Sequence, residues 1–262
     1  MKKRIFSFSQ EDLILLSFLD DVEKGFYIDV GANDPYNGSI TRLFYELGWS
    51  GINIEPLPDM YNKLCDDRSR DINLNIGISN EEGELELRCA GGMSTFNEKV
   101  YIAGDLDKIQ VQVRLLTNVV KENFDFENND IHFCKIDVEG FEKEVLESID
   151  FNLIRPWMFV MESTIPQTNY NIHNEWEDIL TNNNYTFALQ KGVNRYYIEN
   201  NHRFLSDRID NFKNIENKYE IFYVSPFDYT NTYTYKIGLF ISYPYMFFRN
   251  IFYILKYKFK NK

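Results

Sequence analysis

The sequence has few cysteines, no long hydrophobic run and a deficit of basic residues. Its three cysteines, Cys65, Cys89 and Cys134, lie far apart without the C-x-x-C spacing of zinc and redox sites, which favours unpaired thiols in a reducing compartment. In the carboxyl-terminal segment, the longest run without a charged residue, 237–248, is shorter than the roughly 20 residues of a membrane-spanning helix. The first residues also lack the apolar stretch of a signal peptide, so we expect a cytoplasmic protein.

Basic charge is not only scarce but unevenly distributed. The chain has 40 Asp and Glu against 28 Lys and Arg, a net charge of −12. Residues 229–262 hold six basic residues and no acidic one, so residues 1–228 have 22 basic against 40 acidic residues, a net charge of −18. A body this acidic repels nucleic acid, and we find no basic patch in it, so we expect no nucleic-acid partner.

Apolar residues, in contrast, are plentiful. With 262 residues and 44% hydrophobic composition, the chain suits one large domain with an appendage, and we place the domain at 1–228. Short β-rich runs alternate with helical patterns over about 200 residues, which predicts an α/β fold with an open, mostly parallel sheet. Residues 26–55 form the clearest unit: a strand, a helix that Ser39 can cap and Gly48 can end, and a parallel strand ending in Glu55.

The rest of the chain continues this alternation. The patterns predict a helix over 60–67, a strand over 72–79, an antiparallel excursion beside the main sheet from 80, a loop over 91–96, strand, turn and helix over 131–149, a buried strand over 157–163, and a hairpin around Gly192.

The turn Gly31–Pro35 follows the first strand, where open α/β sheets bind ligands. Glu55 lies 24 residues beyond Gly31 at the end of the next strand, where a carboxylate can accept hydrogen bonds from both hydroxyls of a ribose. The turn lacks the G-x-G-x-x-G and G-x-x-x-x-G-K-[ST] patterns that bind pyrophosphate and triphosphate. S-adenosylmethionine, which has a ribose but no phosphate, fits best. Two alternatives stay open: Asp29 and Asp34 only cap the turn, or an unusual turn binds a nicotinamide cofactor.

Seven stretches carry a resemblance to a known family, in the order "FSQEDLIL", "FYIDVGAND", "GWSGINIEP", "NIGIS", "KIDVEGFEKEVL", "RPWMFVMES" and "NRYYI". Together they resemble the FkbM-type family of S-adenosylmethionine-dependent methyltransferases and span residues 8 to about 225. The resemblance implies a class I methyltransferase (Rossmann-like) fold with helices on both faces of the sheet. It also implies methylation of a hydroxyl, commonly on a sugar during glycan or polysaccharide biosynthesis.

The resemblance further implies a cofactor site along the carboxyl ends of the first three strands. The turn after the first strand would line the methionine end, the acid at the end of the second would hold the ribose, and the end of the third would lie near the adenine. An amino-terminal glutamine would close over the cofactor. The residues so assigned to S-adenosyl-L-methionine are Gln10, Asp29, Gly31, Ala32, Asn33, Glu55, Asn75, Gly77 and Ile78.

Methyl transfer to an alcohol requires a base that removes the hydroxyl proton. Asp137 and Glu139 follow a strand at the expected rim of the sheet and are the first candidates, and Glu162 ends the next strand on the same rim. Asp137 can instead cap the helix that begins near Gly140. His173 is a reserve base, with a surface position before a helix as the simpler alternative.

The same rim suggests contacts to a metal ion and to the acceptor. Asp137, Glu139 and Glu162 together could hold Mg²⁺, which prefers oxygen ligands and could orient a sugar diol, but the sequence does not decide this. Asn194 and Arg195 match a pair in the family and are assigned to the hydroxyls of a small-molecule or glycan acceptor. Arg195 can instead form an ion pair in the hairpin.

Residues 229–262 form an aromatic, basic tail with the pattern of an amphipathic helix. Such a helix can lie on an anionic membrane surface, which would place the protein peripherally at the inner face of a membrane. Its apolar face can equally pack on the protein's own domain or on a second copy, giving a homo-oligomer. The alternative function is therefore a non-catalytic, membrane-associated module that retains the methyltransferase fold.

Overall fold

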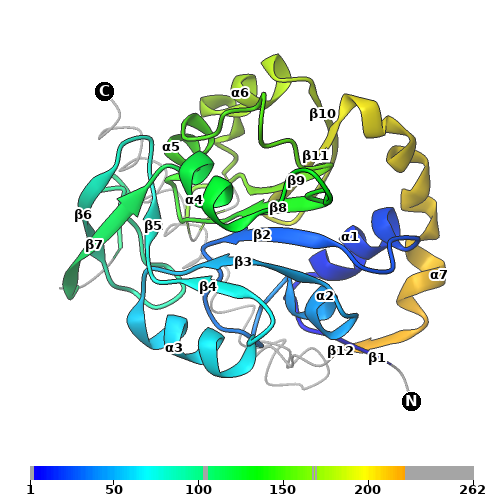
Figure 1. The fold of residues 1–262 in the computed structure, drawn as a ribbon, viewed down its shortest axis with the longest axis horizontal. Coiled ribbons are helices and arrows are strands. Elements are labelled where there is room, and N and C mark those ends of the chain that lie inside the picture. Colours follow the sequence, from blue (N-terminus) through cyan, green and yellow to red (C-terminus); the bar gives the residue numbers. More distant parts are fainter. Residues whose placement is uncertain (1–2, 103–105, 167, 169, 222–262) are drawn as a thin grey trace, which may run out of the picture.

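The computed structural model describes residues 3–102, 106–166, 168 and 170–221 (Figure 1). Its centre is a seven-stranded sheet, in which the strand Asn194–Glu199 is antiparallel to both of its neighbours and the strand pairs from Met158–Glu162 to Ile72–Leu74 are parallel. The predicted parallel unit over residues 26–55 and the hairpin around Gly192 are confirmed. In spatial order the strands are β10 (Tyr185–Lys191), β11 (Asn194–Glu199), β9 (Met158–Glu162), β8 (Phe133–Ile136), β2 (Phe26–Val30), β3 (Ser50–Ile54) and β4 (Ile72–Leu74).

Helices pack on both faces of this sheet because side chains alternate along each strand. Ile28 and Val30 face one hydrophobic core, whereas Tyr27 faces the other. The first core is closed by α4 (Leu116–Asn123), α5 (Glu142–Glu147) and α6 (Glu177–Asn182). The second is closed by α1 (Glu11–Leu19), α2 (Arg42–Glu46), the 3₁₀ helix η2 (Asn200–Asn211) and α7 (Phe212–Glu216). This is the predicted α/β architecture, a central sheet with helices on either side.

Three smaller pieces complete the described fold. A short parallel pair joins the ends of the described chain, α3 precedes β4, and a 3₁₀ turn precedes α6. Their bounds are β1 (Lys3–Ile5), β12 (Tyr219–Ile221), α3 (Pro58–Asp67) and η1 (His173–Glu175).

A separate three-stranded sheet lies beside the main one, at the left of Figure 1. Its order is β5 (Gly77–Ile78), β7 (Lys108–Arg114) and β6 (Gly83–Arg88), with β6 and β7 antiparallel, as the predicted excursion requires. The prediction of one strand over 72–79 is wrong, because the chain leaves the main sheet after Leu74. There the Asn75 side chain donates hydrogen bonds to the carbonyls of Glu55 and Pro56, and β5 pairs with β7 instead.

The strand order reverses at β2. From β2 the chain passes to β3 and β4 on one side, then returns to β8 and β9 on the other. The parallel strands β2, β3, β8 and β9 therefore end at one rim, the place where open α/β sheets bind ligands.

Gly31, just after β2, holds this rim together. Its φ of +79° lies in the left-handed region, and a Cβ at this position would lie 2.1 Å from the carbonyl oxygen of Asp137. Its amide and that of Ala32 both donate to the carbonyl of Ile54, at 3.0 and 3.1 Å. The close approach therefore ties the ends of β2, β3 and β8 together through backbone atoms.

The tail, 229–262, and the boundary proposed at residue 228 lie outside the described residues and stay predictions. No helix within the described ranges combines the length and apolar character needed to cross a membrane.

We expect Gly31→Ala to lower the free energy of unfolding by about 3–5 kcal/mol, because it adds a backbone clash to the cost of a left-handed alanine. Gly48→Ala is a matched control: its φ is +97°, but a Cβ there meets nothing within 4 Å, so it should cost only about 1–2 kcal/mol. Denaturant unfolding measures both. Equal losses would show that the contact with Asp137 is unimportant.

Candidate functional site

Two adjoining cavities of unequal size open at the rim of the sheet. The smaller lies towards β3 and β5, and the larger towards β9 and β11. Both are lined by Gly31, Asn33, Gly92, Asp137 and Glu139, which therefore mark their junction. A group bound in one cavity can thus reach a group bound in the other.

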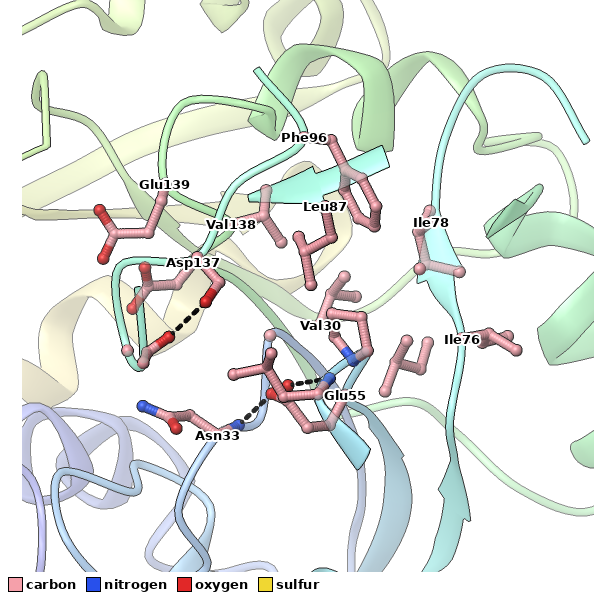
Figure 2. Close-up of a pocket in the computed structure, with 18 residues that line it drawn as sticks. Val30, Asn33, Glu55, Ile76, Ile78, Leu87, Phe96, Asp137, Val138 and Glu139 are labelled. Carbon is pink, nitrogen blue, oxygen red and sulfur yellow. Dashed lines mark hydrogen bonds between the residues drawn. The ribbon is translucent and has the colours of Figure 1, made fainter. Parts of the chain in front are cut away.

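The smaller cavity combines an apolar slot with one buried acid. Ile76, Ile78, Leu87, Phe96 and Val138 supply apolar walls, as Figure 2 shows. Asp137 and Glu139 lie at the opposite end from Ile76 and Ile78. A flat aromatic group fits such walls, and the polar end is left for a charged or hydroxylated part.

Glu55 is the buried acid, and backbone amides hold both of its oxygens. Oε2 accepts a hydrogen bond from the Asn33 amide at 2.7 Å, and Oε1 accepts one from the Leu57 amide at 2.8 Å (Figure 2). Burial raises the pKa of this carboxyl, and the two hydrogen bonds oppose that rise. Each carboxylate oxygen keeps a second lone pair, so Glu55 can still accept from two hydroxyls.

The larger cavity contains a buried lysine that the sequence analysis missed. The Lys135 ammonium donates to the carbonyl oxygen of Gly31 at 2.6 Å and lies 3.2 Å from Asp29 Oδ1 and 3.7 Å from Asp137 Oδ2. Burial works against its charge, but Asp29 and Asp137 outweigh it and raise the pKa of Lys135 above its usual value. The available signal was a lysine inside the apolar strand "FCKI", since lysines are almost never fully buried unless paired.

Asp137, Glu139 and Glu162 come together as predicted. One oxygen from each lies within 4.8 Å of the others. Burial, followed by repulsion from Asp137, raises the pKa of Glu139 to about 9. Burial and then Glu139 also raise the pKa of Glu162 well above its ordinary value. At neutral pH this cluster therefore retains protons unless positive charge is added to it.

The contacts do not support the alternative that Asp137 only caps the following helix. The amides of Val138 and Gly140 donate instead to Glu142, at 3.2 and 3.0 Å. Burial is the main cause that raises the pKa of Glu142, to about 7. Asp137 is thus left pointing to the two cavities, which it helps to line.

The structure separates Asn194 from Arg195. Asn194 is paired with Glu162 in the β9–β11 register and lines the larger cavity. Consecutive strand residues face opposite sides, so Arg195 points to the other face, where it bonds Glu177 at 2.7 Å and Tyr197 at 2.8 Å. His173 also lies there, 3.6 Å from Glu177, and burial lowers its pKa. Arg195 and His173 line neither cavity.

The remaining predicted cofactor residues fall into two groups. Ala32 lines the larger cavity, and Gly77 and Ile78 line the smaller. Gln10 and Asn75 line neither: Gln10 donates to Glu216 at 3.0 Å, and Asn75 supports the backbone after Glu55. The roles predicted for Gln10 and Asn75 therefore have no contact here that favours them, and they stay predictions.

The chain matches the model of a known family. The family model described as the methyltransferase FkbM domain matches residues 29–187. The matched range includes the main residues of the two cavities, namely Glu55, Lys135, Asp137 and Glu139. No curated protein matches the chain.

We expect Lys135→Met to destabilise the protein by about 3–5 kcal/mol, because it leaves the carboxylates of Asp29 and Asp137 near one another without a cation. Lys108→Met removes an exposed lysine paired with Glu86 and should cost less than about 1 kcal/mol. Thermal or denaturant unfolding compares the two. Similar small losses would show that the buried ammonium is dispensable for folding.

The acidic cluster should also make stability depend on pH. An unfolded Glu ionises near pH 4.5, whereas in the folded protein Glu142 keeps its proton to about pH 7 and Glu139 keeps its proton to about pH 9. The folded state binds more protons in this window, so stability falls as pH rises from 4.5 to 9. Glu162→Gln should flatten the decline by up to about 1 kcal/mol per pH unit, and the exposed control Glu81→Gln should not. Unchanged slopes in unfolding measured from pH 5 to 9 would contradict this.

Proposed function

The chain belongs to the methyltransferase FkbM family, and from that premise we propose that it transfers a methyl group from S-adenosylmethionine to a sugar hydroxyl in glycan or polysaccharide biosynthesis. The observation that carries this proposal is the junction of the two cavities at Gly31, Asp137 and Glu139. A donor in the smaller cavity and an acceptor in the larger would meet beside two carboxyl groups.

The smaller cavity fits S-adenosylmethionine by its own chemistry. The apolar slot suits an adenine ring, and Glu55 at its polar side can accept from both ribose hydroxyls. Gly31 lines both cavities with backbone atoms alone, so the methionine portion can approach the turn closely. The turn has no phosphate-binding pattern, which agrees with a cofactor that carries no phosphate.

The reaction requires a base at the junction. S-adenosylmethionine supplies a methyl group on a positively charged sulfonium, so the acceptor oxygen forms its bond to the methyl carbon as the carbon–sulfur bond breaks. Asp137 is positioned to accept the hydroxyl proton, with Lys135 holding its carboxylate from 3.7 Å. When no cation is bound, burial and Asp137 raise the pKa of Glu139 to about 9, so Glu139 holds a proton at neutral pH and can donate a hydrogen bond to an acceptor oxygen.

The larger cavity supports an uncharged, polyhydroxyl acceptor. Its walls include Asp29, Glu162 and Asn194 besides the junction residues. Buried polar groups discriminate strongly for ligands whose hydroxyls can pair with them. The excess of carboxylates disfavours anionic acceptors, including nucleic acid. A sugar meets both conditions.

The alternative, a non-catalytic module at a membrane, depends on the tail at 229–262. No contact among the described residues favours it. Peripheral membrane contact, homo-oligomerisation and cytoplasmic location likewise stay predictions.

Calorimetric titration with S-adenosylhomocysteine, and with NAD in parallel, tests the cofactor. We expect binding of S-adenosylhomocysteine alone, weakened about 10- to 100-fold in Glu55→Gln because hydrogen bonds to a charged acceptor are lost. The exposed Glu81→Gln should bind normally. Binding of NAD would reject the proposal, and binding of neither would favour the non-catalytic alternative.

Methyl transfer to a panel of sugars, followed as release of S-adenosylhomocysteine, tests the base. Asp137→Asn should abolish turnover while leaving cofactor binding within a few-fold of wild type. Retained turnover would reject Asp137. A rate that rises up to about pH 9 and loses this rise in Glu139→Gln would assign the base to Glu139 instead.

A further inference from the structure

The three clustered carboxyl groups are close enough to share a single metal ion. Oxygens that coordinate one ion lie at most two metal–oxygen bonds apart, about 4 Å for Mg²⁺ and about 5 Å for Ca²⁺. One oxygen each of Asp137, Glu139 and Glu162 lies within 4.8 Å of the others, which is inside the limit for Ca²⁺ and requires the carboxyl groups to close by less than about 1 Å around Mg²⁺. Asp137 and Glu139 are on the loop after β8, Glu162 ends β9, and all three line the larger cavity.

A neutral oxygen beside the cluster points independently to a ligand. The Oδ1 atom of Asn194 is buried and has no hydrogen-bond partner, and the side-chain nitrogen of Asn194 lies 3.4 Å from Glu11 Oε1. Asn194 is 4% exposed and lines the larger cavity next to its strand partner Glu162. Glu162, 8% exposed, likewise has an unpartnered oxygen, Oε2. Buried oxygens of this kind normally have a donor or a cation.

The ionisable side chains that line the larger cavity are mostly acidic, so a bound cation would balance their charge. Asp29, Asp137, Glu139 and Glu162 line the larger cavity together with Lys135. The lysine contacts Asp29 and Asp137, and no ion pair within the described part of the chain reaches Glu139 or Glu162. Two acids in the cluster are therefore without a positive partner among these residues.

We propose that Asp137, Glu139, Glu162 and the side-chain oxygen of Asn194 bind one divalent cation, Mg²⁺ or Mn²⁺, in the larger cavity. An all-oxygen donor set without sulfur or imidazole favours these ions over zinc or copper. Three or four protein ligands leave coordination positions open to water or to an acceptor oxygen.

Electron paramagnetic resonance of Mn²⁺ titrated into the full-length protein tests the site. We expect one bound Mn²⁺ per chain, displaced by Mg²⁺, with affinity at least tenfold weaker in Glu162→Gln and in Asn194→Ala. The exposed control Glu81→Gln makes the same substitution away from the larger cavity and should bind like wild type. Circular dichroism verifies folding, and Glu139→Gln, at a less buried position, replaces Glu162→Gln if that variant does not fold.

Calorimetry with S-adenosylhomocysteine on the same samples separates this site from the proposed function. If the protein binds S-adenosylhomocysteine but does not bind the added Mn²⁺, the cation site is overturned and the methyltransferase proposal stands. Mn²⁺ binding that is unchanged in both Glu162→Gln and Glu139→Gln would also overturn it, because exposed carboxylates would then be responsible. Bound Mn²⁺ that is lost in these variants would support the site even if no cofactor bound.

Discussion

The site depends on one buried ammonium group. Lys135 reaches the carbonyl of Gly31 and the carboxylates of Asp29 and Asp137, so a single side chain joins the turn after β2 to the loop after β8. Without this charge, two acids would be close together in a poorly solvated place, where repulsion is strong. Lys135 therefore stabilises the close approach of the proposed base, Asp137, to the turn at Gly31, which is proposed to bind the cofactor.

Strand alternation explains why polar groups gather at this rim. On the face that packs against α1 and α2, Tyr27, Phe133 and Val160 lie in the core. Two residues later on the same face stand Asp29, Lys135 and Glu162, because side chains of a strand repeat every second position. The apolar positions stabilise the sheet, and the next positions on the same face line the larger cavity. The same period turns Asn194 into this cavity and Arg195 away from it.

Local patterns predicted much of this site. The strand, helix and strand over 26–55, the glycine turn and the acid at Glu55 are all recognisable over a short span of chain, and the hairpin around Gly192 is as well. The meeting of Asp137 with Glu162 followed from a general rule, that parallel strands end at one rim. Strand 72–79 was mispredicted because the break at Asn75 depends on carbonyls about 20 residues away.

The sequence by itself determined the alternation of strands and helices, the family resemblance and the residue types at the ends of the strands, since these depend on neighbours along the chain. Only the tertiary structure decided which polar groups touch. The carbonyl of Asp137 occupies the space that a Cβ atom at Gly31 would need. The pairing of β2 with β8 brings Lys135 to the carbonyl of Gly31 and to the carboxylates of Asp29 and Asp137. Such contacts join residues about 100 positions apart, and their distances depend on strand order and register, which no local pattern specifies.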